Sequence, residues 1–81
     1  MNPKSKTTVE DVVSTVLGIS REVITNETSP ANTEEWDSFN GLLLATELEK
    51  KFCVKFSFEE VLEVKNVGDI KKILKRHNIQ V

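Results

Sequence analysis

The sequence predicts an all-α fold, a small antiparallel bundle of three main helices and one short helix, with a long loop after the first helix. Apolar residues recur at helical spacing in four separate segments, and capping residues precede these segments. The only short alternation typical of a strand, residues 54–56, lies between two of them. With 81 residues, the chain is long enough for one modest core. We therefore expect a single domain over residues 1–81, with residues 1–6 flexible.

The first helix is expected over residues 9–17. Thr7 and Glu10 have the spacing of a capping box, in which two side chains satisfy free backbone N–H groups at the helix start. Valine and leucine residues of helical period form the apolar stripe, and Gly18 ends the helix.

A long loop follows over residues 19–36 and contains Asn26, Ser29, Pro30 and Asn32. Loops of this length in compact domains are often functional or held by contacts of their own. We expect Val23 and Ile24 to hold this one by packing inward.

The second helix is expected over residues 38–51. Asp37 is its predicted N-cap, because a short carboxylate there accepts hydrogen bonds from free backbone N–H groups. Apolar residues occur on two sides of this helix. The first side, the expected core stripe, holds Gly41, Leu44, Ala45, Leu48 and Phe52. The second holds Phe39, Leu42, Leu43 and Thr46. Since charged residues share the helix, we expect the second side to be an exposed docking surface rather than extra core.

The third helix is expected to be short, over residues 58–63. Ser57 and Glu60 repeat the capping-box spacing at its start. Val61 and Leu62 are expected to face inward.

The fourth helix is expected over residues 67–76, with Asn66 as its N-cap and Asp69 at its third position. Asn78 can close it. Its apolar stripe consists of Val67, Ile70, Ile73 and Leu74.

The composition is that of an ordinary globular protein, with 38% hydrophobic and 30% charged residues. No apolar run approaches the roughly 20 residues of a membrane-spanning helix. No apolar segment typical of a signal peptide follows the N-terminus, so a cytoplasmic location is expected. The single cysteine excludes an internal disulfide.

The net charge of −2 is unevenly distributed. Residues 34–63 are mostly acidic among their charged side chains, whereas residues 65–76 are mostly basic. An acidic middle suits basic protein partners and repels nucleic-acid phosphates. We interpret the basic segment as a solvated helix end whose cations offset the helix dipole, and not as a DNA-binding surface.

Ser38 lacks the partners of a catalytic nucleophile, which needs an adjacent, oriented base. The only histidine, His77, lies at the far end of the last helix and is expected to be a surface residue. Cys53 is expected to be a small half-buried residue. No cluster has the spacing of metal ligands and no glycine-rich phosphate loop is present. We therefore expect neither an enzyme nor a metal site.

The start of the second helix is also suited to binding an anion. Free N–H groups and the positive end of the helix dipole stabilise an anion, such as a phosphodiester on the Ser38 oxygen. A helix start after a long loop is also accessible to a modifying enzyme. The alternative is that Asp37 and Ser38 simply begin a helix.

Four segments together distinguish these alternatives: WDSFN at 36–40, ELEKKF at 47–52, FSFEE at 56–60 and NVGDI at 66–70. With their spacing, their helix order and the long first loop, they resemble the acyl carrier protein family over residues 9–74. The Asp-Ser pair is weak by itself, and the combination is specific.

The resemblance implies that Ser38 carries 4′-phosphopantetheine, installed from coenzyme A by a phosphopantetheinyl transferase. It implies that Asp37 helps to position the transferase and its metal. The thiol of the arm would carry acyl groups as thioesters, and the core of the bundle would shelter or release them. The expected partner-binding residues are Phe39, Leu42, Leu43, Thr46 and Glu47.

The implied partners are an acyl-activating ligase or acyltransferase, and condensing and other acyl-processing enzymes of fatty-acid, lipid or polyketide-type biosynthesis. The carrier is expected to be a monomer. Asn40 and Leu43 replace acids common in the family, which indicates a specialised carrier with a dedicated partner. Residues 35–36 (EW) replace the Gly-Gly pair typical of many peptidyl carriers, which favours acyl over aminoacyl cargo.

Two alternatives stay open. The chain could be a peptidyl or aminoacyl carrier, or an unmodified helical adaptor that binds a partner through the apolar side of the second helix. Acceptance of the cofactor by Ser38 separates the carriers from the adaptor.

Overall fold

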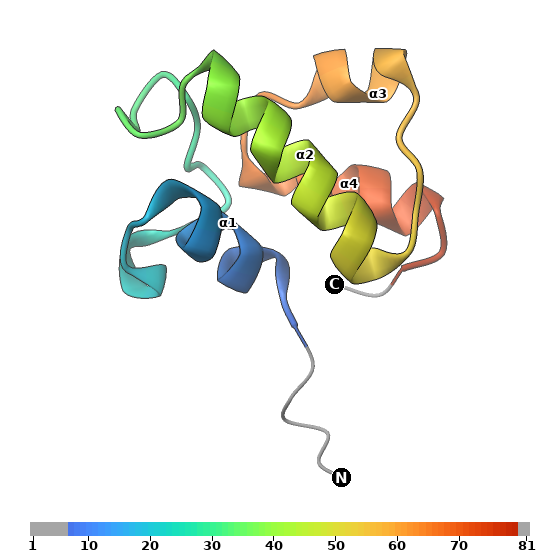
Figure 1. Cartoon of the computed structure of the whole chain (residues 1–81), viewed down its shortest axis with the longest axis horizontal. Coiled ribbons are helices and arrows are strands. Elements are labelled where there is room, and N and C mark those ends of the chain that lie inside the picture. Colours follow the sequence, from blue (N-terminus) through green and yellow to red (C-terminus); the bar gives the residue numbers. More distant parts are fainter. Residues whose placement is uncertain (1–6, 80–81) are drawn as a thin grey trace, which may run out of the picture.

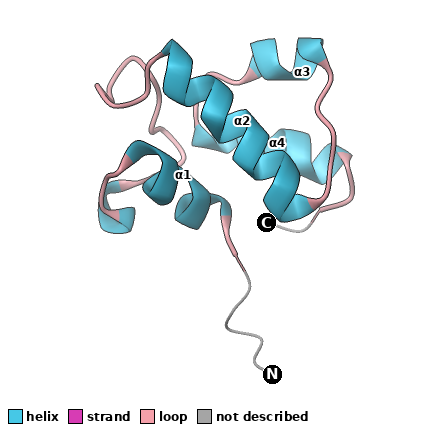
Figure 2. Cartoon of the chain, viewed as in Figure 1, coloured by secondary structure: helices cyan, strands magenta, loops and turns pink. Residues whose placement is uncertain are grey.

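The computed structural model describes residues 7–79, so the flexibility expected of residues 1–6 lies outside the described part. The chain forms four α-helices and one 3₁₀ turn, and every regular element in residues 7–79 is helical (Figures 1 and 2). In chain order these are α1 (Val9–Leu17), η2 (Arg21–Val23), α2 (Ser38–Phe52), α3 (Phe58–Glu63) and α4 (Val67–Arg76). The predicted all-α fold is confirmed.

Helix α1 begins with a capping box one residue later than predicted. Thr8 Oγ1 accepts from the Asp11 N–H at 3.1 Å, and Asp11 Oδ2 accepts from the Thr8 N–H at 3.0 Å. The predicted pair of Thr7 and Glu10 is wrong, because the Glu10 carboxylate instead pairs with a lysine of α4. Gly18 ends the helix as predicted, in the left-handed conformation (φ 69°) that a residue without Cβ adopts freely.

The core lies where α1 packs on α2 and α4, and α2 crosses in front of α4 in Figure 1. All four predicted stripe residues of α4 are buried, as are Leu44 and Leu48 of α2. The loop before α2 adds Trp36, which is only 5% exposed. The buried hydrophobic residues are Val9, Val12, Val13, Leu17, Ile24, Trp36, Leu44, Leu48, Val67, Ile70, Ile73 and Leu74.

The loop between α1 and α2 is only partly held in the predicted way. Ile24 is buried as expected, but the prediction for Val23 is wrong, because its side chain is 65% exposed at the end of η2. Local alternation within the loop does not reveal which of two neighbouring apolar residues turns inward.

Backbone hydrogen bonds to the start of α4 hold the rest of this loop. The Val67 N–H donates to the Thr28 carbonyl at 3.0 Å, and the Gly68 N–H donates to the Asn26 carbonyl at 3.0 Å. A Cβ on Gly68 would lie 3.4 Å from that Asn26 oxygen. These donors are N–H groups at a helix start, which have no partner within their own helix.

Helices α3 and α4 have the predicted bounds and caps. The Glu60 N–H donates to Ser57 Oγ at 3.1 Å and the Ser57 N–H donates to Glu60 Oε1 at 3.0 Å, which completes the predicted capping box. Asn66 Oδ1 accepts from the Asp69 N–H at 2.8 Å. Val61 is half-buried, but the inward orientation predicted for Leu62 is wrong, because its side chain is 61% exposed.

The sequence predicted that the basic side chains of α4 are solvated, and this prediction is only partly correct. Lys71 Nζ lies 2.6 Å from Glu10 Oε2 of α1, and Arg76 Nη2 lies 2.8 Å from Glu63 Oε1 of α3. Charges of the basic segment therefore tie α4 to its neighbours. None of the helices within residues 7–79 has the length and apolar character needed to cross a membrane.

Candidate functional site

Ser38 is the first residue of α2, and Asp37 is its N-cap as predicted. Asp37 is extended (φ −98°, ψ −174°), and its Oδ1 accepts from the Asn40 N–H at 2.8 Å. Asn40 in turn donates from Nδ2 to the Glu35 carbonyl at 2.8 Å. These two hydrogen bonds of Asn40 fix the angle at which the long loop enters the helix. Asn40 therefore has a structural role that its sequence position did not reveal.

The Ser38 side chain is exposed, and its hydroxyl makes no hydrogen bond to any of residues 7–79. The backbone N–H groups of Ser38 and Phe39 also have no partner among these residues. Such N–H groups and the positive end of the dipole of α2 favour a negative charge close to the Ser38 oxygen. The site therefore fits an exposed phosphodiester on this serine.

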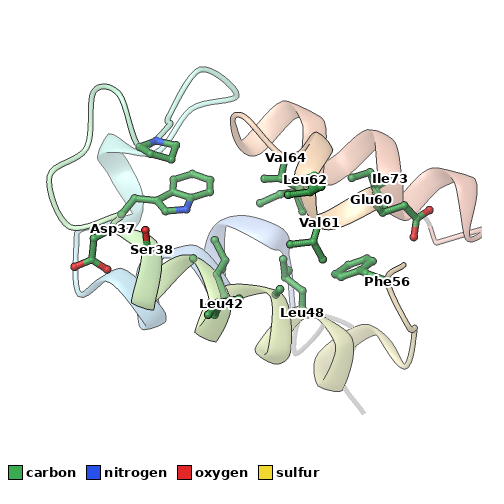
Figure 3. A pocket seen from close by; sticks show the side chains of 16 residues that line it. Asp37, Ser38, Leu42, Leu48, Phe56, Glu60, Val61, Leu62, Val64 and Ile73 are labelled. Carbon is green, nitrogen blue, oxygen red and sulfur yellow. The ribbon is translucent and has the colours of Figure 1, made fainter. Parts of the chain in front are cut away.

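A groove of about 700 Å³ lies beside Ser38, between α2 and α3. Figure 3 shows Ser38, Leu42 and Leu48 of α2 along one side and Val61 and Leu62 of α3 along the other. Asp37, Ser38 and Glu60 supply the polar side chains of the lining, apart from the indole nitrogen of Trp36. The groove is lined by Pro30, Trp36, Asp37, Ser38, Gly41, Leu42, Leu44, Ala45, Leu48, Phe56, Glu60, Val61, Leu62, Val64, Ile70 and Ile73.

Sequence reasoning missed most of this groove. Leu44 and Leu48 were expected to fill a core, yet they also line the groove. The signal that could have revealed it is the shortness of α3, because six residues cannot cover the whole side of a 15-residue helix.

The predicted docking side of α2 is exposed. The exposed fractions are 69% for Phe39, 64% for Leu42 and 41% for Leu43. Thr46 is exposed and donates its hydroxyl to the Leu42 carbonyl at 3.1 Å, while Glu47 lies 3.5 Å from Lys50 Nζ. This side of α2 is therefore available to a partner.

Helix α3 adds two apolar residues that the prediction did not include in the surface. Phe58 is 73% exposed and Leu62 is 61% exposed. Leu42 and Leu62 both line the groove, so one exposed leucine of α2 and one of α3 lie on either side of it.

Two residues outside the site differ from their predictions. Cys53 is exposed rather than half-buried, because it ends α2 in the left-handed conformation (φ 55°). His77 is half-buried rather than a surface residue, with its Nε2 3.1 Å from both carboxylate oxygens of Glu60. Within residues 7–79, no three His, Cys, Asp or Glu side chains are grouped so that they could hold a metal ion.

Comparison with known proteins shows which family and which relatives this chain is similar to. Residues 7–74 match the model of a family described as a phosphopantetheine attachment site. Two relatives from Brachyspira hyodysenteriae, one of them from strain ATCC 49526 / WA1, are both named acyl carrier protein. Each is 34% identical to this chain over 70 residues, which cover 85% of this chain and 90% of the relative.

Proposed function

The chain belongs to the acyl carrier protein family and carries 4′-phosphopantetheine, and on that premise we propose that Ser38 is the attachment residue. One observation carries this assignment. The Ser38 hydroxyl is exposed, forms no hydrogen bond to residues 7–79 and lies at one end of an apolar groove. When bound, the arm supplies a thiol that holds an acyl group as a thioester.

The residues around Ser38 have separate tasks in this proposal. The free N–H groups of Ser38 and Phe39 stabilise the phosphodiester charge. Asp37 holds the helix start in place through its bond to the Asn40 N–H, and its second carboxylate oxygen faces the transferase and the metal of that enzyme. The Ser38 oxygen forms a bond to the phosphorus that carries pantetheine in coenzyme A, and the pyrophosphate bond of coenzyme A breaks. Adenosine 3′,5′-bisphosphate leaves, and the hydroxyl proton passes to the transferase.

The groove between α2 and α3 shelters the acyl chain. Its walls are mostly apolar, and burial of each methylene group contributes about 0.8 kcal/mol. Helix α3 is only six residues long and contributes no fully buried residue, so it is the wall that can move as a chain enters or leaves. The chain itself performs no catalysis in this proposal.

Partner enzymes dock on the exposed side of α2. The surface consists of Phe39, Leu42, Leu43, Thr46 and Glu47. The partners are a phosphopantetheinyl transferase, an acyl-activating ligase or acyltransferase, and condensing and other acyl-processing enzymes. Because Asn40 and Leu43 stand where acids are common, apolar contacts carry more of the recognition and the partner is a dedicated one. Residues 1–81 act as one domain, a monomer in the cytoplasm, in a fatty-acid, lipid or polyketide-type pathway.

The test is the intact mass after incubation with coenzyme A and a promiscuous phosphopantetheinyl transferase. We expect the wild type to gain the mass of one arm. The Ser38→Ala variant should gain nothing and should keep its helical circular dichroism, because the exposed Ser38 hydroxyl makes no hydrogen bond within residues 7–79.

A mass gain on Ser38→Ala would place the attachment elsewhere. Folded wild type that gains no mass with several transferases would favour the unmodified adaptor, which uses the same exposed surface. For a loaded carrier, a matched pair of ligases, one for fatty acids and one for amino acids, separates acyl from aminoacyl cargo.

A further inference from the structure

The indole N–H of Trp36 is a hydrogen-bond donor at the groove that has no acceptor among residues 7–79. Trp36 is 95% buried, since only 5% of its surface is exposed, and it lines the groove together with Ser38. Its N–H makes no hydrogen bond to residues 7–79, and these residues contain no fully buried polar side-chain atom that lacks a partner. The indole nitrogen therefore reaches the surface of the groove.

Gly41 keeps this N–H uncovered. A Cβ at position 41 would lie 3.4 Å from Trp36 Nε1 and 3.7 Å from Cδ1, in direct contact with the donor. Glycine is a poor residue for the interior of a helix such as α2. The absence of a side chain here leaves an opening through which a ligand atom can reach the indole nitrogen.

The chemistry of the donor defines its ligand. An indole N–H can only donate, and a few placed polar groups in a mostly apolar site fix the orientation of what binds there. We propose that the Trp36 N–H donates a hydrogen bond to a carbonyl oxygen of the group tethered to Ser38 and thereby positions that group in the groove. This proposal rests on the proposed attachment at Ser38. The carbonyl can belong to an amide of the arm or to the acyl thioester.

Trp36 is the only tryptophan of the chain, so a ¹⁵N-labelled sample gives one indole N–H signal by NMR. Four forms are compared, each verified by intact mass: without arm, with the free arm, with an octanoyl thioester, and with an S-octyl thioether that lacks the thioester carbonyl. We expect the indole proton to move downfield and to exchange more slowly with solvent in a tethered form.

The outcomes separate the sources of the carbonyl. If the indole signal already changes with the free arm, the acceptor is an amide of the arm. If it changes only with the octanoyl thioester, the acceptor is the thioester carbonyl. Verified loading without any change overturns the proposal. An equal change with octanoyl and S-octyl forms, absent with the free arm, means that chain packing suffices and also overturns it. Failure to gain the arm would appear in the mass first and would refute the proposed function itself.

Two variants test the geometry. Trp36→Phe retains a ring but removes the donor, and the octanoyl chain should occupy the groove between about 2-fold and about 10-fold less, measured by NOEs from a ¹³C-labelled chain to Leu48. Gly41→Ala covers the donor with a methyl group and should fold at least as well, because alanine favours helix. Its indole signal should lose the response to loading. A full response in Gly41→Ala, or unchanged occupancy in folded Trp36→Phe, would overturn the proposal.

Discussion

Both carboxylate oxygens of Glu60 lie 3.1 Å from Nε2 of His77, which joins the short helix α3 to the end of α4. The same carboxylate accepts from the Ser57 N–H at 3.0 Å and so also caps α3. The His77 ring meets Phe56 edge-on, with ring centroids 6.1 Å apart. Phe56 and Glu60 line the groove at the end away from Ser38 in Figure 3, so this contact links α3 to α4 at that end.

Glu60 should make the protein sensitive to acid. The hydrogen bond from the Ser57 N–H, then the contact with His77, lower the pKa of Glu60 from its ordinary value of about 4.3. A carboxyl group with a lower pKa in the folded state stabilises the fold fully above its unfolded pKa, and this contribution disappears as the pH falls through the folded pKa. We expect Glu60→Gln to lose less stability than the wild type as the pH falls below about 4.3. The free energy of unfolding in urea, measured at a series of pH values, tests this.

Glu59→Gln is the matched control, because the exposed side chain of Glu59 makes no hydrogen bond within residues 7–79. Its pH profile should follow the wild type. An equal effect of both substitutions would show that net charge, and not the Glu60 contacts, causes the acid sensitivity.

Asp37 should have separable structural and recognition roles. Asp37→Asn keeps an N-cap acceptor, so the free energy of unfolding should change by less than about 1 kcal/mol, whereas Asp37→Ala should lose about 1 kcal/mol. Because a hydrogen bond to a charged group contributes more than a neutral one, we expect loading of Asp37→Asn by the transferase to be about tenfold slower. Loading of Asp37→Asn at the wild-type rate would restrict Asp37 to capping.

Substitutions at Leu43 and Leu44 should differ widely in their cost to stability although the two residues are neighbours. Leu43 is 41% exposed, so Leu43→Glu should cost less than about 1 kcal/mol, including the repulsion of Glu47 one turn later. Leu44 is 2% exposed, and Leu44→Ala should cost about 2–5 kcal/mol through lost burial and a cavity. Chemical unfolding measures both, and a comparable loss for both would place Leu43 in the core.

Cys53→Gly should stabilise the protein. Cys53 ends α2 at φ 55°, a left-handed conformation that costs a residue with Cβ about 1 kcal/mol and that glycine adopts freely. Its side chain is exposed, so little packing is lost. The melting temperature should rise for Cys53→Gly. Lys51→Gly, inside the same helix, should lower it, because glycine there reduces the free energy of unfolding by about 1 kcal/mol. A decrease for Cys53→Gly would mean that the thiol packs.

The helix bounds were largely predictable because their determinants are local. The period of apolar residues and the caps at Asp37, Ser57 and Asn66 lie within one turn of the helices that they define. The N-cap of α1 was not predictable in this way. Two capping pairs of equal spacing compete there, and Lys71, 61 residues away, engages the acid of the losing pair.

The helices, their apolar stripes and the exposed serine at the start of α2 follow from local sequence patterns and from a recognisable set of family motifs. The tertiary structure decided which apolar residues are covered: Trp36 is buried although it belongs to a loop, whereas Val23 and Leu62 are exposed. It also decided that α2 and α3 form a groove and that His77 meets Glu60. Helix signals depend on neighbours a few residues apart, whereas burial depends on segments that meet only when the chain is folded.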